Sequence, residues 1–288
     1  MTPWLLAARP KTLAAAVTPV LVGTALARAA SPTHWPSFFE ALLGAVFIQI
    51  GTNYVNDALD FKKGADTHAR LGPLRVTQAG LLSAEAVLRG AYVCFVLAAL
   101  CGIPLILRGG WPIVAIGIAS IAAAYAYTGG PYPLAYHGLG EVFVMIFFGF
   151  TAVCGSFYLQ TLKLDPTAWL GGFAVGSLAV VILAINNLRD IDNDRASNKR
   201  TLAARFGVKF ARIEIVIFAL VPFLCVAAIA WLRSARTLMI PMLALILAIA
   251  LLVRVARSRG AELNRCLALA GALEWSFGIL YVIGAAVG

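Results

Sequence analysis

Residues 51–60 read Gly51-Thr-Asn-Tyr-Val-Asn-Asp-Ala-Leu-Asp60, and they place two carboxylates and two amides at the end of an otherwise apolar run. A later apolar run ends in a similar way, with Asn186-Asn-Leu-Arg-Asp-Ile-Asp-Asn-Asp194. Ionisable groups at the edge of a membrane span are costly unless they have partners, and they usually mark function. The two acidic clusters therefore predict one functional site, with the rest of the chain as its scaffold.

The composition is that of a membrane protein. Hydrophobic residues make up 61% of the 288 positions and charged residues only 12%, far from the averages of soluble domains. The net charge of +10 is compatible with nucleic-acid binding, but the basic residues fall in short segments between apolar runs, where membrane topology explains them better. We therefore expect an all-α polytopic membrane protein whose partner is the lipid bilayer and not nucleic acid.

Nine stretches are long and apolar enough to be transmembrane helices, since about 20 apolar residues span a bilayer. They cover residues 12–28, 38–58, 84–106, 111–128, 139–160, 167–187, 210–232, 237–256 and 266–286. Residues 1–288 are expected to form a single transmembrane domain.

The distribution of Lys and Arg predicts the orientation. Of the 23 basic residues, 18 fall on one side of the nine spans and five on the other: Arg28, Arg108, Lys163, Arg233 and Arg236. Cytoplasmic loops carry an excess of Lys and Arg. The N-terminus and both acidic clusters are therefore expected on the cytoplasmic side, in a bacterial protein of the inner membrane.

The positions of the clusters suggest an internal repeat. Asp57 and Asp190 end the second and sixth spans, which four crossings separate, so both lie at the same membrane face. A four-helix unit used twice, over residues 12–128 and 139–256, followed by a ninth helix, explains this spacing.

The acidic clusters have the residue types of a magnesium–diphosphate site. Steps of three and four residues place side chains on one face of a helix, whereas Asp192 lies two residues from each acidic neighbour and should point away. Mg²⁺ prefers carboxylates, substrate phosphates and water. The alternative is that these are charged helix caps at the interface. The residues that share a face are Asn53, Asn56, Asp57 and Asp60 in the first cluster, and Asn186 or Asn187, Asp190 and Asp194 in the second.

Basic residues surround both clusters and precede the first span. Guanidinium and ammonium groups can bind phosphate oxygens and stabilise a leaving diphosphate. The alternative for each basic residue is that it only determines the membrane topology. The candidates are Arg9, Lys11, Lys63, Arg70, Arg75, Arg189, Lys199 and Arg200.

The segment between the fourth and fifth spans, residues 125–141, is rich in tyrosine. Interfacial Tyr residues are usually belt residues, but the π-face of Tyr127 could also stabilise a substrate cation. For His137 and Glu141 a structural role is the simpler interpretation.

Together these motifs resemble the UbiA superfamily of intramembrane aromatic prenyltransferases. The resemblance rests on Asn56-Asp57-x-x-Asp60, on Asp190-x-x-x-Asp194 and on the nine expected spans. Five further motifs are similar to the branch that prenylates 1,4-dihydroxy-2-naphthoate: Arg9-Pro-Lys-Thr-Leu, Gly72-Pro-Leu-Arg-Val-Thr-Gln-Ala-Gly80, Tyr127-Thr-Gly-Gly-Pro, Asn187-Leu-Arg-Asp and Lys199-Arg-Thr-Leu.

The resemblance implies a helical bundle around a central cavity, with Mg²⁺ held by Asp57, Asp60, Asp190 and Asp194. It also implies transfer of a polyprenyl group from polyprenyl diphosphate to 1,4-dihydroxy-2-naphthoate with loss of CO₂, as in menaquinone synthesis. The third Asp of the first superfamily motif is replaced by Gly64, which leaves a metal role for Asp66 undecided.

Two other functions stay open. The first is the same chemistry on another aromatic acceptor, such as 4-hydroxybenzoate or homogentisate, although the Lys-Arg pair common in the 4-hydroxybenzoate branch is absent after Tyr132-Pro. The second is an ion-coupled transporter, which would carry acidic sites near the middle of the membrane. Both clusters lie at one face here, which favours the enzyme.

Overall fold

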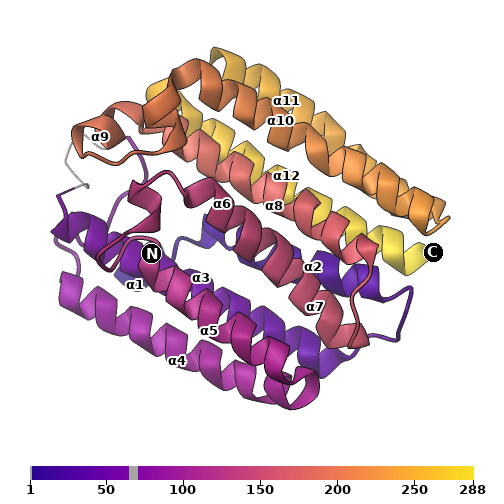
Figure 1. The fold of residues 1–288 in the computed structure, drawn as a ribbon. Helices are drawn as coiled ribbons and strands as arrows, with labels where there is room; N and C mark the ends of the chain where they lie inside the picture. The colour runs from indigo at the N-terminus through magenta and orange to yellow at the C-terminus, as the bar shows by residue number, and fades with distance from the viewer. Residues whose placement is uncertain (1, 65–70) are drawn as a thin grey trace.

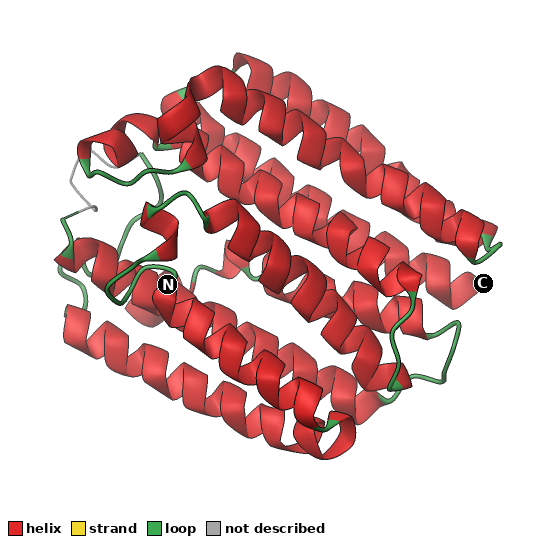
Figure 2. Ribbon diagram, in the orientation of Figure 1, coloured by secondary structure: helices red, strands yellow, loops and turns green. Residues whose placement is uncertain are grey.

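The computed structural model describes residues 2–64 and 71–288, and within these ranges every regular element is helical (Figure 2). The first half contains α1 (Pro3–Ala8), η1 (Pro10–Thr12), α2 (Ala14–Ala27), α3 (Trp35–Lys62), α4 (Ala84–Gly109), α5 (Trp111–Ala126) and η2 (Leu134–Tyr136). The second half contains α6 (Gly140–Val144), the π-helical turn η3 (Met145–Thr151), α7 (Ala152–Thr161), α8 (Pro166–Arg189), α9 (Ile191–Ala196), α10 (Leu202–Leu232), η4 (Arg236–Ala244), α11 (Leu245–Arg257), η5 (Gly260–Glu262) and α12 (Leu263–Val287).

Local sequence sets where the long helices begin. The side chains of Ser83, Asp165 and Thr201 accept backbone N–H groups in the first turns of α4, α8 and α10, which satisfies donors that have no partner inside a helix. Pro residues occupy the first turns of α3, α5 and α8, where a missing N–H costs nothing. These residues therefore define where each connecting loop ends and the next helix begins.

Most of the expected membrane spans are present as long apolar helices. Among the described residues, seven helical segments are long and apolar enough to cross a membrane: Trp35–Lys62, Ala84–Gly109, Gly140–Thr161, Pro166–Arg189, Leu202–Leu232, Arg236–Arg257 and Gly260–Val287. The first and fourth expected spans are the shorter apolar helices α2 and α5, of 14 and 16 residues. The prediction of an all-helical integral membrane protein is confirmed, and the internal repeat stays a prediction.

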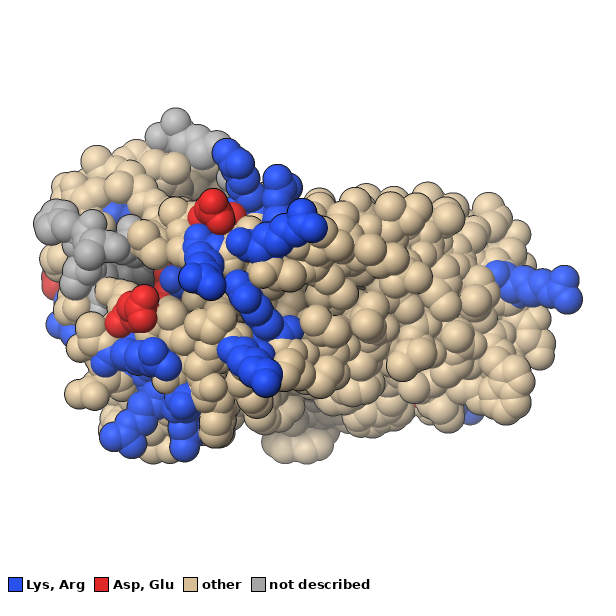
Figure 3. Space-filling model, turned by 90° about the horizontal axis from the view of Figure 1, so that it is seen from above, with Lys and Arg blue, Asp and Glu red and all other residues tan. Residues whose placement is uncertain are grey.

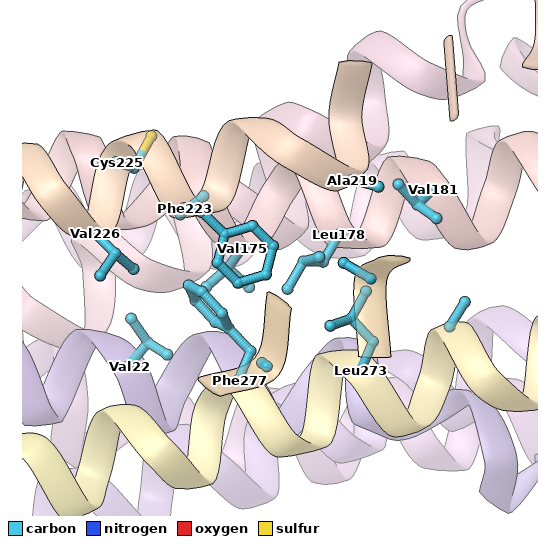
Figure 4. Packing of buried hydrophobic residues seen from close by; sticks show 14 of the residues in the cluster. Val22, Val175, Leu178, Val181, Ala219, Phe223, Cys225, Val226, Leu273 and Phe277 are labelled. Carbon is cyan, nitrogen blue, oxygen red and sulfur yellow. The ribbon is translucent and has the colours of Figure 1, made fainter. Parts of the chain in front are cut away.

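The helices form an elongated bundle (Figure 1), and two large hydrophobic cores lie within it. One core joins α1, α3, α4 and α5, and the larger one joins α2, α7, α8, α10, α11 and α12. In the larger core Phe223 of α10 meets Phe277 of α12 edge to face, with ring centroids 6.2 Å apart, and Val22 and Leu178 pack nearby (Figure 4). Burial of these side chains holds the second half of the bundle together.

Close glycine contacts join η3 to α8. A Cβ on Gly149 would lie 2.6 Å from the carbonyl oxygen of Gly172 and 2.9 Å from the Cα of Gly176. Only glycine permits this approach, as in many contacts between membrane helices. The contact brings the start of α6 beside the end of α8, where Asn187 Nδ2 donates to Glu141 Oε1 over 2.8 Å.

The basic residues gather at one end of the bundle. On the face formed by α10 and α11, most Lys and Arg side chains lie near the end that carries α9, and the rest of the face is largely free of charge (Figure 3). At this end α3, α5 and α8 finish and α4, α6, α10 and α12 begin. Both acidic clusters belong to it.

Candidate active site

A cavity opens at the charged end of the bundle and brings both acidic clusters together. Its volume is about 160 Å³, the space of roughly five water molecules, which suits a charged head group and not a long lipid tail. Its lining includes Arg9, Asn56, Asp60, Arg75, Tyr127, Thr128, Glu141, Asn186, Asn187, Arg189, Asp190, Asn193, Asp194, Lys199 and Thr201. Four of these are basic and four are acidic, so the cavity carries no large net charge before a ligand binds.

The first cluster is divided between the cavity and its supporting wall. Asn56 and Asp60 line the cavity, but Asn53 and Asp57 do not. Asp57 is directed instead towards the loop that contains Val76 and Thr77. The expectation that all four side chains share one functional face is therefore met only in part.

The carboxylate of Asp57 binds the loop that follows α3. It is 1% exposed, and its two oxygens accept the backbone N–H groups of Val76 over 3.3 Å and Thr77 over 3.0 Å. This arrangement fixes the backbone directly after Arg75. A metal role for Asp57 stays a prediction, while the structure gives the residue a clear role as an anchor for this loop.

Asp60 is held by two donors at the cavity wall. Arg75 Nη2 lies 3.2 Å from Asp60 Oδ2, and the Tyr136 hydroxyl donates to Asp60 Oδ1 over 3.0 Å. Asn56, one turn earlier, accepts from the hydroxyl of Thr128 over 2.5 Å. The segment after α5 thus orients both cavity-lining residues of the first cluster.

Asp190 pairs with its neighbour Arg189 at the end of α8. Arg189 Nε and Nη2 donate to the two Asp190 oxygens over 2.9 and 2.6 Å, and this two-point contact fixes the carboxylate plane. Arg189 Nη1 also donates to Asn264 Oδ1 over 2.8 Å, and Asn264 Nδ2 donates to the carbonyl oxygen of Leu71 over 2.8 Å. The pair is therefore tied to α12 and to the loop after α3.

Asp194 is the most enclosed acid of the second cluster. It is 3% exposed, accepts from the Thr201 hydroxyl over 3.2 Å, and lies 3.8 Å from Lys199 Nζ. Burial raises the pKa of Asp194, and the negative charge of Asp190 adds to this, while Lys199 opposes it. Asp192, by contrast, is exposed, as its spacing predicts.

Tyr127 lies between the two clusters. It lines the cavity, and its hydroxyl is close to the backbone of Gly140 at the start of α6. Burial, followed by the negative charges of Glu141, Asp60 and Asp194, raises the pKa of Tyr127. Its hydroxyl therefore stays protonated and able to donate.

The remaining predicted residues lie at different distances from the cavity. Arg9 lines it, with a left-handed backbone (φ 51°) between α1 and η1, and Asn53 supports this turn by donating to the Ala8 carbonyl over 2.9 Å and to the Thr12 hydroxyl over 3.0 Å. Lys63 and Arg200 do not line the cavity. Asp66, Arg70 and the side chain of Lys11 lie outside the described residues.

Several residues of the site were not among the predicted site residues. Thr128 and Thr201 orient acidic-cluster side chains, and Asn264 supports Arg189 from a helix more than 70 positions away. Tyr136 sits among several interfacial tyrosines that look alike in sequence. Only the tertiary arrangement separates these residues from their neighbours.

The donors fit a magnesium–diphosphate complex. Asn56, Asp60, Asp190 and Asp194 offer only oxygen ligands to the cavity, the type that Mg²⁺ prefers. In the described parts of the chain, no group of three His, Cys, Asp or Glu side chains is close enough to hold a metal ion. Mg²⁺ commonly takes one or two carboxylates plus substrate phosphates and water, so these residues suit a metal that arrives with diphosphate.

The chain is similar to proteins of one known family. The sequence model of the UbiA prenyltransferase family matches residues 16–278. The 1,4-dihydroxy-2-naphthoate octaprenyltransferase of Haemophilus influenzae is 37% identical over 255 residues, which cover 84% of this chain and 83% of the relative. The enzyme of the same name from Escherichia coli is 40% identical over 221 residues, covering 73% and 70%.

Solved structures share the fold. A UbiA homologue from Aeropyrum pernix superposes with a TM-score of 0.76 at 16% identity, covering 94% of this chain and 97% of the other. A UbiA homologue from Archaeoglobus fulgidus, bound to DMAPP and Mg²⁺, superposes with a TM-score of 0.63 at 14% identity, covering 97% and 98%.

Proposed function

Because the chain belongs to the UbiA prenyltransferase family, we propose that it transfers a polyprenyl group from its diphosphate to 1,4-dihydroxy-2-naphthoate, with loss of CO₂. The observation that carries this proposal is the meeting of two acidic clusters, from α3 and from α8–α9, in one cavity that also holds four basic side chains. Relatives 37–40% identical over most of the chain bear the corresponding name, which supports the naphthoate acceptor and the menaquinone product.

The basic side chains of the cavity would bind the diphosphate. Arg9, Arg75, Arg189 and Lys199 come from four separate segments and all line the cavity. Guanidinium groups suit phosphate oxygens because they donate two parallel hydrogen bonds. Distributed around the diphosphate, these donors would stabilise the charge that develops as it leaves.

Asn56, Asp60, Asp190 and Asp194 would hold Mg²⁺ together with oxygens of the diphosphate. Mg²⁺ bound there would neutralise negative charge on the leaving group. The solved relative bound to DMAPP and Mg²⁺ supports this assignment at the level of the fold. Asp57 is better suited to holding Arg75 in place, because it does not line the cavity and its oxygens accept the backbone N–H groups directly after Arg75.

The reaction then requires a space beside the diphosphate that excludes water and stabilises the allylic cation. When the allylic C–O bond breaks, its electron pair leaves with the diphosphate, and the carbon that bears the carboxylate on the naphthoate ring forms the new C–C bond. Loss of CO₂ returns an electron pair to the ring and restores aromaticity. Tyr127 lies at the cavity wall with a protonated hydroxyl, and its ring would stabilise the allylic cation.

The proposed orientation places this site at the cytoplasmic face of a bacterial inner membrane. The 18-to-5 division of basic residues supports it by the positive-inside rule. A polyprenyl tail is too bulky for a cavity of about 160 Å³, so it would extend between the helices towards lipid, while the charged reactants enter from water.

The test is product identification with competing acceptors. Purified protein in lipid nanodiscs would receive Mg²⁺, allylic diphosphates of several lengths, and equal amounts of dihydroxynaphthoate, 4-hydroxybenzoate and homogentisate. Mass spectrometry should find a prenylated naphthalenediol without the carboxylate as the main product. Preferential prenylation of another acceptor would reassign the substrate, and the absence of any prenylated product would refute the proposed function.

A further inference from the structure

Tyr136 lies where three segments of the site meet. It closes the short turn η2, and the N–H of its neighbour Ala135 donates to the Tyr127 carbonyl over 2.9 Å. The Arg200 N–H donates to the Tyr136 carbonyl over 3.0 Å. Backbone hydrogen bonds therefore connect this turn to the end of α5 and to the segment after α9.

The ring of Tyr136 attracts one lysine from each acidic segment. Lys63 Nζ, directly after α3, lies 4.9 Å from the ring centroid, and Lys199 Nζ, after α9, lies 5.6 Å from it. Both distances are within the reach of a cation–π interaction, which stabilises an ammonium group over an aromatic face.

The hydroxyl of the same side chain reaches the first acidic cluster. It donates to Asp60 Oδ1 over 3.0 Å, while Arg75 Nη2 donates to Asp60 Oδ2 over 3.2 Å. Lys63 is further fixed by donating to the Thr128 carbonyl over 2.5 Å, and Thr128 also binds Asn56. One tyrosine thus links two cations and one carboxylate of the site.

We propose that Tyr136 is a positioning residue: its ring holds Lys199 at the cavity, where that ammonium group acts on the diphosphate, and Lys63 just outside the cavity, while its hydroxyl orients Asp60. Tyr136 does not line the cavity itself, so it acts through these three side chains. The inference rests on the proposed function for its ligand, a magnesium diphosphate head group.

The two parts of the side chain can be separated by substitution. Tyr136→Phe keeps the ring and removes the hydroxyl, whereas Tyr136→Leu removes both. Tyr132→Leu is the matched control, because Tyr132 is an exposed tyrosine of the same segment that stacks on His137. Lys199→Met removes one of the two cations.

The experiment measures the binding of inorganic diphosphate by calorimetry, with Mg²⁺ as a second variable, on purified full-length protein without acceptor. Tyr136→Leu should weaken diphosphate binding roughly tenfold, since two cation–π contacts are lost. The affinity of Tyr136→Phe for diphosphate should stay within about twofold of that of the wild type. This variant should need several times more Mg²⁺ for half-saturation, because it loses the hydrogen bond to the ionised Asp60 carboxylate, and hydrogen bonds to ionised groups are strong. Tyr132→Leu should match wild type.

A double-mutant cycle provides the decisive readout. If Tyr136 acts through Lys199, the effects of Tyr136→Leu and Lys199→Met should be clearly less than additive. Additive effects, or a Tyr136→Leu protein that binds diphosphate like wild type, would overturn the inference. If the Tyr136→Leu protein does not fold, the cycle is repeated with Tyr136→Phe, which keeps the ring. The effects of Tyr136→Phe and Lys199→Met on diphosphate binding should then be fully additive. Coupling between these two substitutions would also overturn the inference. Failure of the wild type to bind magnesium diphosphate would instead refute the proposed function.

Discussion

Replacing Asp57 by Asn is expected to weaken the binding of the prenyl diphosphate and to leave the Mg²⁺ requirement unchanged. Asp57 accepts the N–H groups of Val76 and Thr77, and the flat amide of Asn keeps one acceptor oxygen but replaces the other with a donor. One of the two hydrogen bonds is therefore lost. The loop that carries Arg75 would be held less firmly, and Arg75 is one of the four basic side chains that line the proposed diphosphate site.

The magnitude follows from the burial of the partners. Val76 is fully buried and Thr77 is 4% exposed, so water cannot easily replace the missing acceptor. A hydrogen bond to a charged group contributes about 1.5–3 kcal/mol. If this loss falls mainly on the ordered position of Arg75, the KM for prenyl diphosphate should rise roughly tenfold to a hundredfold.

Steady-state kinetics with separately varied prenyl diphosphate and Mg²⁺ would measure this effect. Asp60→Asn is the comparison, because Asp60 lines the cavity with its carboxylate, and it should mainly raise the Mg²⁺ concentration for half-maximal rate. The reasoning would be refuted if Asp57→Asn raised the Mg²⁺ requirement as much as Asp60→Asn and left the KM for diphosphate unchanged. Asp57 would then be a metal ligand, as the motif alone suggests.

Three other predictions concern metal binding and packing. Asp190→Asn and Asp194→Asn should each remove most turnover, measured in membranes with equal amounts of inserted protein, whereas Asp192→Asn should retain it because that carboxylate is exposed. Burial raises the pKa of Asp194, and metal binding requires the ionised carboxylate, so protons should compete with Mg²⁺ more strongly in acid. The Mg²⁺ concentration that gives the half-maximal rate should therefore be higher at about pH 6 than at about pH 8. A Mg²⁺ requirement that does not change with pH would contradict this. Gly149→Ala should lower stability by about 1–3 kcal/mol through overpacking against α8, seen as a lower Tm, while Gly117→Ala in α5, where a Cβ meets nothing within 4 Å, should not.

The sequence predicts the helices well because long apolar runs leave few alternatives in a membrane. The expected span at 84–106 is the helix Ala84–Gly109, and the expected span at 167–187 is Pro166–Arg189. The π-helical turn Met145–Thr151 was not predicted. It lies where glycines of two helices are in close contact, which periodicity in one segment does not reveal.

The sequence predicted which residue types form the candidate site, but not which acidic residues line the cavity and which support its wall. Spacing places Asn56, Asp57 and Asp60 in one cluster, yet the direction of each carboxylate depends on the loop that packs beside α3. Val76 and Thr77 present their N–H groups to Asp57, while Tyr136 and Arg75 reach Asp60. These contacts join segments 15 to 76 positions apart, so a motif cannot assign them.

The most direct test of the proposed activity follows the carboxylate of the acceptor. Dihydroxynaphthoate labelled at its carboxyl carbon would be incubated with the protein, an allylic polyprenyl diphosphate and Mg²⁺, and labelled CO₂ and prenylated product would be counted together. One labelled CO₂ should be released for each prenyl group transferred, and none without the diphosphate or with excess chelator. A prenylated product that retains the label, or CO₂ release that does not require the prenyl diphosphate, would contradict the proposed reaction.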